Sequence, residues 1–254
     1  MKALITGASS GIGKDMARYL SSKGFDLVLT ARSREKLEKL KEELDTDVKI
    51  VCADLADPDG AFELYRQCRD DGIDFLINNA GYGLFGKFDK TDLYDELDMI
   101  NVNIRSLHIL TKIFLRDFKK RGSGRILNVA SSAGFMTGPL MAAYYASKNY
   151  VVRLSLAIYE ELRREKSPVK ISVFCPGPVD TNFNERAGVR FGISSISSQY
   201  AAEYAIDNAL NGKTVIIPTL GMKLGTIGSR FLPFKMLGAM TYNIQHKKSG
   251  GKKI

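Results

Sequence analysis

The sequence is poor in the residues that build metal centres and disulfide frameworks, and it has no long hydrophobic run. Its only cysteines are Cys52, Cys68 and Cys175, whose spacing matches no metal-ligand motif. Because their number is odd and two of them fall in strand-like segments, we expect reduced thiols that act as small hydrophobic side chains. No stretch of about 18 uncharged apolar residues occurs, so no membrane-spanning helix is expected.

The sequence also shows no boundary between domains. No linker rich in Pro, Gly or Ser divides the 254 residues, no repeat is visible, and only the Lys/Gly-rich tail is of low complexity. The first apolar segment begins almost at Met1, which leaves no room for a secretory signal. We therefore expect one domain over residues 1–254 and a cytoplasmic location.

Positive charge exceeds negative charge, with a net charge of +9. Four of the basic residues lie among the last eight residues, so much of the excess belongs to a tail. No helix-turn-helix, zinc or base-stacking signature accompanies the charge, and we expect no nucleic-acid partner.

Short apolar segments alternate with amphipathic segments along the chain. This alternation favours an α/β fold with a seven-stranded parallel sheet, covered by helices on both faces and with its ligand at the carboxyl ends of the strands. The predicted strands are residues 2–6, 26–30, 48–52, 74–78, 125–130, 169–175 and 214–218.

A glycine-rich turn, TGASSGIG, follows the first predicted strand. Gly7, Gly11 and Gly13 lie in it, and an amphipathic helix covers about residues 12–23. Glycines allow the backbone to approach a pyrophosphate, and the start of a helix offers unpaired N–H groups to it. In this context the turn indicates a dinucleotide site in a doubly wound, Rossmann-type fold rather than an ordinary turn.

Tyr144 and Lys148 stand four residues apart, and Ser131 lies thirteen positions before Tyr144. On a helix this spacing places the phenol and the ammonium group on one face. The lysine charge would favour the phenolate and bring the pKa of Tyr144 closer to neutrality. The alternative is a buried tyrosine beside a lysine that reaches to solvent.

Together these motifs resemble the short-chain dehydrogenase/reductase family over residues 1 to about 181. The resemblance implies hydride transfer between a nicotinamide and a carbonyl or carbinol carbon. The motifs that carry it are the glycine turn, Asp54, Asn78-Asn79-Ala80-Gly81, Asn103, Ser131, Tyr144-x-x-x-Lys148 and Pro176-Gly177-Pro178-Val179-Asp180-Thr181.

The resemblance implies four catalytic residues. Tyr144 donates the proton during reduction, and Ser131 donates a hydrogen bond to the same substrate oxygen. Lys148 holds the nicotinamide ribose and favours the phenolate, while Asn103 positions a water that links Lys148 to solvent.

Tyr144, Ser131 and Asn103 each have a residue of the same type nearby, but that neighbour does not have the spacing of the family motif. Tyr145 would face another element of the fold and is assigned to packing. Ser132 and Asn101 are set aside in favour of Ser131 and Asn103.

The implied cofactor is NADP(H). Where an NAD enzyme usually has an acid after the second strand, this chain has Ala31, followed by Arg32 and Arg34. Ser10 departs from the basic residue of many NADP-dependent relatives, and Lys14 lies inside the helix. The implied cofactor-binding residues are Gly7, Ser9, Ser10, Gly11, Ile12, Gly13, Arg32, Asp54, Leu55, Asn79, Ala80, Gly81, Tyr144, Lys148, Pro176, Gly177, Val179 and Thr181.

Asp54 and the extension at residues 219–254 each allow more than one interpretation. Asp54 either meets the adenine or caps a helix that starts near Pro58. Residues 182–198 are expected to form a substrate lid. The apolar and basic extension, residues 219–254, is either a lid or subunit contact, which we prefer, or a peripheral membrane contact.

The sequence thus predicts an NADP(H)-dependent oxidoreductase that acts on a carbonyl or secondary alcohol of an apolar or lipid-like small molecule. One alternative is a reductase of carrier-bound 3-oxoacyl thioesters, whose acidic carrier a basic surface would attract. Another is a non-catalytic NADP-binding regulator or a membrane-associated interaction protein. The resemblance also implies a homo-dimer or homo-tetramer.

Overall fold

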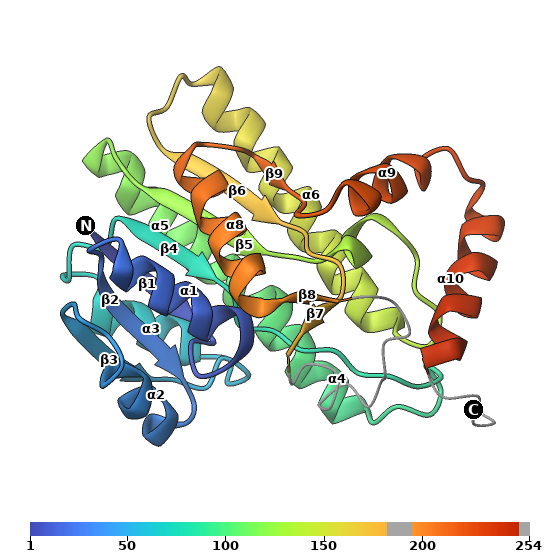
Figure 1. Cartoon of the computed structure of the whole chain (residues 1–254), viewed down its shortest axis with the longest axis horizontal. Helices are drawn as coiled ribbons and strands as arrows, with labels where there is room; N and C mark the ends of the chain where they lie inside the picture. Colours follow the sequence, from blue (N-terminus) through green and yellow to red (C-terminus); the bar gives the residue numbers. More distant parts are fainter. Residues whose placement is uncertain (182–194, 249–254) are drawn as a thin grey trace.

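A seven-stranded parallel sheet forms the centre of the protein (Figure 1). The structure is a computed structural model that describes residues 1–181 and 195–248. The strands are β1 (Lys2–Thr6), β2 (Asp26–Ala31), β3 (Val48–Cys52), β4 (Phe75–Asn78), β5 (Arg125–Val129), β6 (Lys170–Phe174) and β9 (Val215–Ile216). The predicted fold class is confirmed. Strand β9 is shorter than predicted because it pairs through only two residues at the edge of the sheet.

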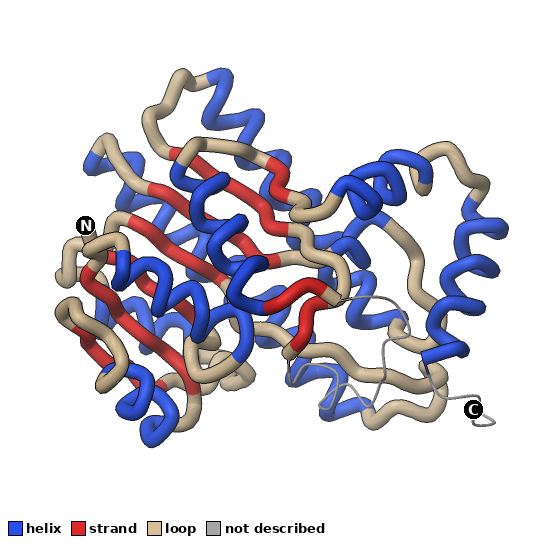
Figure 2. The backbone as a smooth tube through the Cα atoms, in the orientation of Figure 1, coloured by secondary structure: helices blue, strands red, loops and turns tan. Residues whose placement is uncertain are grey.

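Helices cover both faces of the sheet (Figure 2). One apolar core lies under α1, α2 and α8, and a second lies under α3, α5 and α6. The strands are continuously apolar because both of their faces are buried, as in β4, where all four residues are buried. The bounds are α1 (Gly11–Ser22), α2 (Arg34–Lys41), α3 (Gly60–Cys68), α5 (Leu107–Arg121), α6 (Ala142–Arg164) and α8 (Ser198–Leu210).

The strand order is β3-β2-β1-β4-β5-β6-β9, so the chain reverses its direction of winding between β1 and β4. Crevices at the carboxyl ends of strands form where the winding reverses, and ligands of such sheets bind there. The glycine turn after β1 and the Asn-Ala-Gly segment after β4 therefore lie side by side at this edge.

Several short elements lie outside the predicted strands. Helix α4 (Leu93–Ile100) continues into a π-helical segment, η1 (Asn101–Ser106), before α5 begins. A short 3-10 helix, η2 (Ser132–Phe135), follows β5. Strands β7 (Val179–Asp180) and β8 (Ile196–Ser197) form a separate parallel pair, so the described end of the expected lid is a strand; residues 182–194 lie outside the described residues.

Beyond β9 the chain forms two further helices, α9 (Leu220–Gly228) and α10 (Phe234–Lys248), which project from the sheet at the right of Figures 1 and 2. Within the described residues, neither these helices nor any other is both long and apolar enough to cross a membrane. The three cysteines are free thiols, as expected, and Cys68 and Cys175 are buried.

Candidate functional site

The glycine turn is shaped by close contacts that only glycine permits. Gly7 and Gly11 have φ angles of +67° and +53°, in the left-handed region. The Asn79 side-chain amide donates to the carbonyl oxygens of Thr6 and Gly7 at 3.0 and 3.2 Å, which joins the turn to the end of β4. A Cβ on Gly13 would lie 2.3 Å from Asn79 Nδ2. The absence of a side chain at Gly13 therefore allows Asn79 to pack closely against the turn.

The amino terminus of α1 suits an anionic group. Its first turn contains no acidic residue, and Ser10 at the N-cap makes no side-chain capping bond. The helix dipole and the first backbone N–H groups favour negative charge at this point. The turn and the helix start thus fit the pyrophosphate of a dinucleotide.

A cavity of about 1090 Å³ opens at the carboxyl edge of the sheet and brings most of the predicted residues together. Gly13 and Asn103 are predicted site residues that do not line it: Gly13 packs beneath the turn, and Asn103 is fully buried behind the wall. The predicted residues that do line it are Gly7, Ser9, Ser10, Gly11, Ile12, Arg32, Asp54, Leu55, Asn79, Ala80, Gly81, Ser131, Tyr144, Lys148, Pro176, Gly177, Val179 and Thr181.

The end of the cavity near β2 is polar and basic. The side chain of Arg32 is 60% exposed, and its Nη1 lies 4.0 Å from Asp54 Oδ2. The hydroxyl oxygen of Thr30 is buried in the cavity wall without a hydrogen-bond partner among the described residues. Lys36 of α2 also lines this end, although no sequence motif pointed to it.

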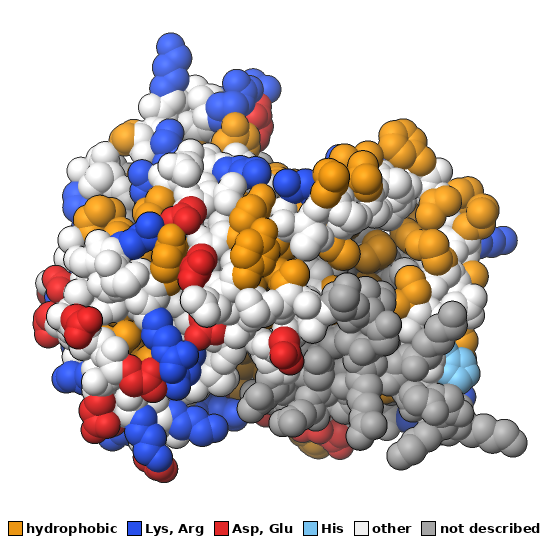
Figure 3. All heavy atoms as spheres, viewed as in Figure 1, with side chains coloured by type: hydrophobic (Ala, Val, Ile, Leu, Met, Phe, Trp, Pro, Cys, Tyr) orange, Lys and Arg blue, Asp and Glu red, His pale blue; other side chains and the backbone are white. Residues whose placement is uncertain are grey.

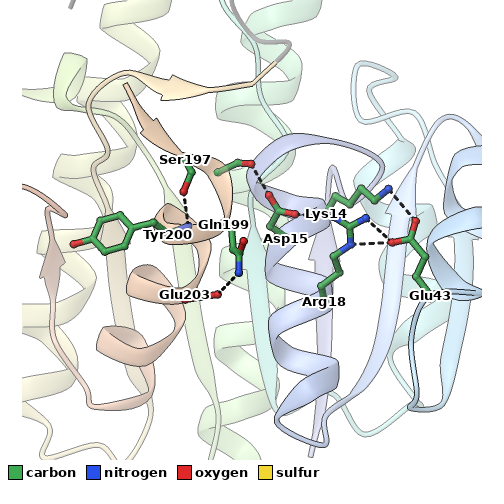
Figure 4. Close-up of polar contacts among 9 residues, drawn as sticks. Lys14, Asp15, Arg18, Glu43, Ser197, Gln199, Tyr200 and Glu203 are labelled. Carbon is green, nitrogen blue, oxygen red and sulfur yellow. Dashed lines mark hydrogen bonds and ion pairs between the residues drawn. The ribbon is translucent and has the colours of Figure 1, made fainter. Parts of the chain in front are cut away.

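Lys14 and Arg34 are both paired with acidic residues. Figure 4 shows Lys14 and Arg18 of α1 directed toward Glu43; the Lys14 Nζ–Glu43 Oε1 distance is 3.1 Å. Arg34 Nη1 lies 3.5 Å from Glu38 on the outside of α2, and Arg34 does not line the cavity. Of the two arginines after β2, only Arg32 is therefore placed to meet a ligand.

The proposed helix-capping role of Asp54 is wrong. Helix α3 begins at Gly60, and Asp59 occupies its N-cap. Asp54 Oδ1 instead accepts a hydrogen bond from the Ala56 backbone N–H at 3.0 Å, in a local turn that leaves the carboxylate beside the cavity.

Helix α6 places Tyr144 and Lys148 on one face, next to the end of β5. Lys148 Nζ donates to the Val129 carbonyl oxygen at 3.0 Å and lies 5.9 Å from the centre of the Tyr144 ring. Ser131 follows β5, and its hydroxyl is hydrogen-bonded to that of Tyr144. The Ala133 backbone N–H donates to Ser131 Oγ at 3.1 Å and fixes its position. The structure thus brings the serine, tyrosine and lysine together.

Burial shifts the pKa values of both Tyr144 and Lys148. It raises the pKa of Tyr144 to about 12, although the hydrogen bond from Ser131 acts in the opposite direction. Burial also lowers the pKa of Lys148 to about 8. The expected lowering of the tyrosine pKa by the lysine is therefore wrong, because desolvation disfavours the charged forms of both groups.

Asn103 is buried in η1 beside Lys148. A Cβ on Gly81 would lie 2.9 Å from Asn103 Oδ1 and 3.2 Å from Lys148 Nζ, so the three residues are packed together. Asn103 Oδ1 accepts from the Tyr82 backbone N–H at 3.1 Å. Asn101, which the offsets disfavoured, instead donates to the Ala56 carbonyl oxygen at 3.0 Å.

Tyr145 does more than pack. Its ring lies against Gly138, and its hydroxyl accepts a hydrogen bond from the side-chain amide of Gln245, one hundred residues away on α10. Both residues line the cavity. The oxygen of the Gln245 amide is buried and has no partner among the described residues. No sequence pattern linked these two positions.

The outer end of the cavity is mostly apolar. Helix α9 contributes Met222, whose side chain would be 3.0 Å from a Cβ on Gly177. Thr181 packs against Gly11 and so joins the segment after β6 to the glycine turn. Sequence motifs singled out none of the residues at this end, although some of them belong to the 219–254 extension that was expected to form a lid or subunit contact. The lining residues here are Tyr82, Leu84, Met136, Met141, Tyr145, Met222, Thr241, Ile244 and Gln245.

Comparison with known proteins identifies the class of protein to which this arrangement belongs. The family profile described as "short chain dehydrogenase" matches residues 1–189. The chain therefore belongs to the short-chain dehydrogenase family of oxidoreductases.

Relatives and solved structures agree with this assignment. An uncharacterized oxidoreductase of Staphylococcus epidermidis is 35% identical over 193 residues, which cover 75% of this chain and 82% of that protein. A short-chain dehydrogenase from Sphingobium yanoikuyae, solved with NADPH, has a TM-score of 0.81 and 29% identity, with 90% and 93% of the two chains covered. The bulky-bulky ketone specific alcohol dehydrogenase from Comamonas testosteroni has a TM-score of 0.76 and 26% identity, with 91% and 98% covered.

Proposed function

We propose that the protein is an NADP(H)-dependent oxidoreductase that interconverts a carbonyl and a secondary alcohol. The observation that carries this proposal is the convergence of Ser131, Tyr144 and Lys148 on one cavity that also contains the glycine turn. The test is a panel of carbonyl substrates followed by NADPH absorbance. A non-catalytic NADP-binding regulator would bind the cofactor and turn over none of them.

The proposed chemistry divides the work among four residues. The bound nicotinamide supplies the hydride in the reduction direction. Tyr144 gives its proton to the substrate oxygen, and Ser131 donates a hydrogen bond to that oxygen. Lys148 holds ribose hydroxyls and stabilises the tyrosine anion, and Asn103 positions a water through which the proton is replaced.

The pKa of Lys148 explains why a buried lysine suits this role. With a pKa of about 8, it is mostly charged at neutral pH yet releases its proton readily. Because the phenol has the higher pKa, transfer of a proton from Lys148 to the tyrosine anion is favourable. The raised pKa of Tyr144 keeps its phenol protonated at neutral pH, which the proposed role as proton donor in reduction requires.

We assign the cofactor as NADP(H) because a guanidinium, and no unpaired carboxylate, follows β2. Arg32 can grip a 2′-phosphate, and Lys36 adds a second positive charge at the same end of the cavity. The relative from Sphingobium yanoikuyae, solved with NADPH, is consistent with this assignment. Asp54 would meet the adenine, and the remaining cavity residues between Gly7 and Thr181 would hold the rest of the cofactor.

Replacing Arg32 by aspartate should change the cofactor preference. We expect Arg32→Asp to lower the ratio of kcat/KM with NADP(H) to kcat/KM with NAD(H) by at least about tenfold, because a charged hydrogen bond is lost and a repulsive charge is added. Arg34→Asp is the matched control, since Arg34 lies outside the cavity and should leave the ratio unchanged. An unchanged ratio in Arg32→Asp would refute the assignment.

The walls of the outer cavity support an apolar or lipid-like substrate. Met136, Met141 and Met222 are adaptable apolar side chains at this end, and Ile244 adds a fourth. The Comamonas testosteroni relative is described as specific for bulky-bulky ketones. The rival substrate, a 3-oxoacyl thioester, belongs in the same panel, where a preference for the carrier-bound form would favour it.

One polar group in this apolar end should contribute to specificity. We propose that the unpartnered oxygen of Gln245 accepts a hydrogen bond from a hydroxyl or amide of the substrate. Gln245→Met should lower kcat/KM about tenfold for a ketone that carries such a group and leave its deoxy analogue unaffected. In the control, Thr241→Val, the lost hydroxyl is already bonded to the Leu237 carbonyl oxygen at 2.8 Å. Equal effects of Gln245→Met on both ketones would argue against this role.

Three further expectations complete the proposal. We propose a single domain whose residues 1–181 carry the cofactor and catalytic motifs. We further propose a cytoplasmic enzyme that assembles as a homo-dimer or homo-tetramer.

A further inference from the structure

Helices α9 and α10 turn apolar side chains outward, which is unusual for helices that face water. Leu220, Leu224 and Ile227 follow one another at four- and three-residue spacing, and they form an exposed stripe along α9. Phe231 in the connection and Phe234 at the start of α10 are 83% and 85% exposed. Figure 3 shows the hydrophobic side chains gathered over both helices. We call this surface the α9–α10 face, formed by Leu220, Leu224, Ile227, Phe231, Phe234, Met236 and Met240.

The inward positions of the same helices hold mostly polar side chains, together with the buried Leu237 of α10. On α9 and in the residue after it, Thr226 and Ser229 are buried, and their hydroxyls donate to the carbonyl oxygens of Lys223 and Thr226 at 2.9 and 3.0 Å. On α10, Thr241 and Gln245 are buried and line the cavity. Thr226, Ser229 and Thr241 are therefore satisfied by local hydrogen bonds, whereas Gln245 donates to Tyr145 and presents its remaining amide oxygen at the cavity. The apolar outer face is left without a partner among the described residues.

The charges around the α9–α10 face have one sign. Asp207 is the last acidic residue of the chain, and every charged residue after it is a lysine or arginine. Lys235 stands between the exposed Phe234 and Met236, and Arg230 precedes Phe231. An apolar surface with interspersed basic residues is complementary to a surface that combines hydrocarbon with negative charge.

A second copy of the chain fits this face less well. In a symmetric dimer the same patch of each copy would meet, so Arg230 and Lys235 of both copies would approach one another. Like charges at a contact repel, and no acidic residue of this segment is available to pair with them.

From these observations we infer that the α9–α10 face binds the surface of an anionic membrane, with its apolar side chains in the headgroup and acyl boundary. The inner sides of α9 and α10 line the substrate cavity, so the same two helices separate that cavity from the lipid surface. The two interpretations of this segment, as a lid and as a membrane contact, then apply to its two sides. The inference concerns binding alone and does not depend on turnover.

The test is sedimentation of the full-length protein with vesicles. We expect binding to phosphatidylcholine vesicles with about a quarter phosphatidylglycerol to exceed binding to pure phosphatidylcholine at least tenfold, and to weaken as salt is raised. The double variant Phe231→Ser, Phe234→Ser should lose at least about tenfold of this partitioning.

The control double variant is Leu93→Ser, Tyr94→Ser. These side chains are 63% and 78% exposed, but they lie on α4, whose first turn is acidic. The control should bind vesicles as the parent does. Circular dichroism of both variants checks that exposed substitutions have left the fold intact.

Several outcomes would overturn the inference. Failure of the parent to bind anionic vesicles would do so, as would equal binding to neutral vesicles or equal losses in the two double variants. If size-exclusion chromatography shows a parental oligomer that Phe231→Ser, Phe234→Ser dissociates, without vesicle binding, the face is a subunit contact instead.

Discussion

Tyr144→Phe is expected to lower kcat about a thousandfold while cofactor affinity stays within a few fold of the parent, since a positioned general acid contributes roughly 10²–10⁴ in rate. In the proposed mechanism the phenol supplies the proton and little else, because its ring is held by burial and its hydroxyl by Ser131. The measurement is kcat with a panel substrate, together with the Kd for NADPH from fluorescence titration.

Tyr145→Phe is the matched control. It removes a hydroxyl from the adjacent residue, which also lines the cavity but is bonded to Gln245. We expect its kcat to stay within about tenfold of the parent, with any change appearing mainly in KM. If Tyr145→Phe abolishes turnover and Tyr144→Phe retains it, the assignment of the proton donor must be reversed.

Lys148→Met is expected to reduce kcat/KM at least about a hundredfold and, unusually, to stabilise the cofactor-free protein. A fall in the lysine pKa from 10.5 to about 8 corresponds to a cost on the order of 3 kcal/mol for holding the charge in the folded state near pH 7. Loss of the bond to the Val129 carbonyl offsets about 1 kcal/mol of that cost. A net gain of about 2 kcal/mol remains by this arithmetic, measurable by urea unfolding.

The difference in stability between Lys148→Met and the parent should depend on pH in a defined direction. Below pH 8 the lysine is charged in both the folded and the unfolded protein, so the whole cost is present. Between pH 8 and 10.5 the unfolded protein binds more protons, and the stability of the parent rises toward that of the variant. The advantage of Lys148→Met should therefore shrink as the pH rises. An advantage that grows with pH, or a variant less stable at pH 7, would contradict the burial argument.

The sequence predicted correctly that Tyr144 and Lys148 lie together, because the geometry of this pair is local. Tyr144 and Lys148 lie on one helix at a fixed spacing, so their proximity follows from helical geometry alone. The glycine turn lies between a strand and a helix that are adjacent in sequence, and its shape follows from the same short segment. The offsets also separated Asn103 from Asn101, whose side chain is directed to Ala56.

Predictions about contacts between residues far apart in the sequence, or about the effect of burying a side chain, were less successful. No pattern in the sequence indicated that Gln245 contacts Tyr145, because one hundred residues separate them and no motif marks either position. It assigned Asp54 two roles, and only the start of α3 at Gly60 excludes one of them. It also placed the pKa of Tyr144 too low, because the cost of desolvation depends on packing around the whole side chain.

By itself, the sequence determined the family, the parallel sheet, the glycine turn and the spacing of Ser131, Tyr144 and Lys148. These features arise from short segments, in which the periodicity of a helix or strand fixes which side chains meet. Only the tertiary structure decided which arginine lies at the cavity, what burial does to Tyr144 and Lys148, and which sides of α9 and α10 face water. Those properties depend on contacts between segments far apart in the chain and on the removal of water that such contacts produce.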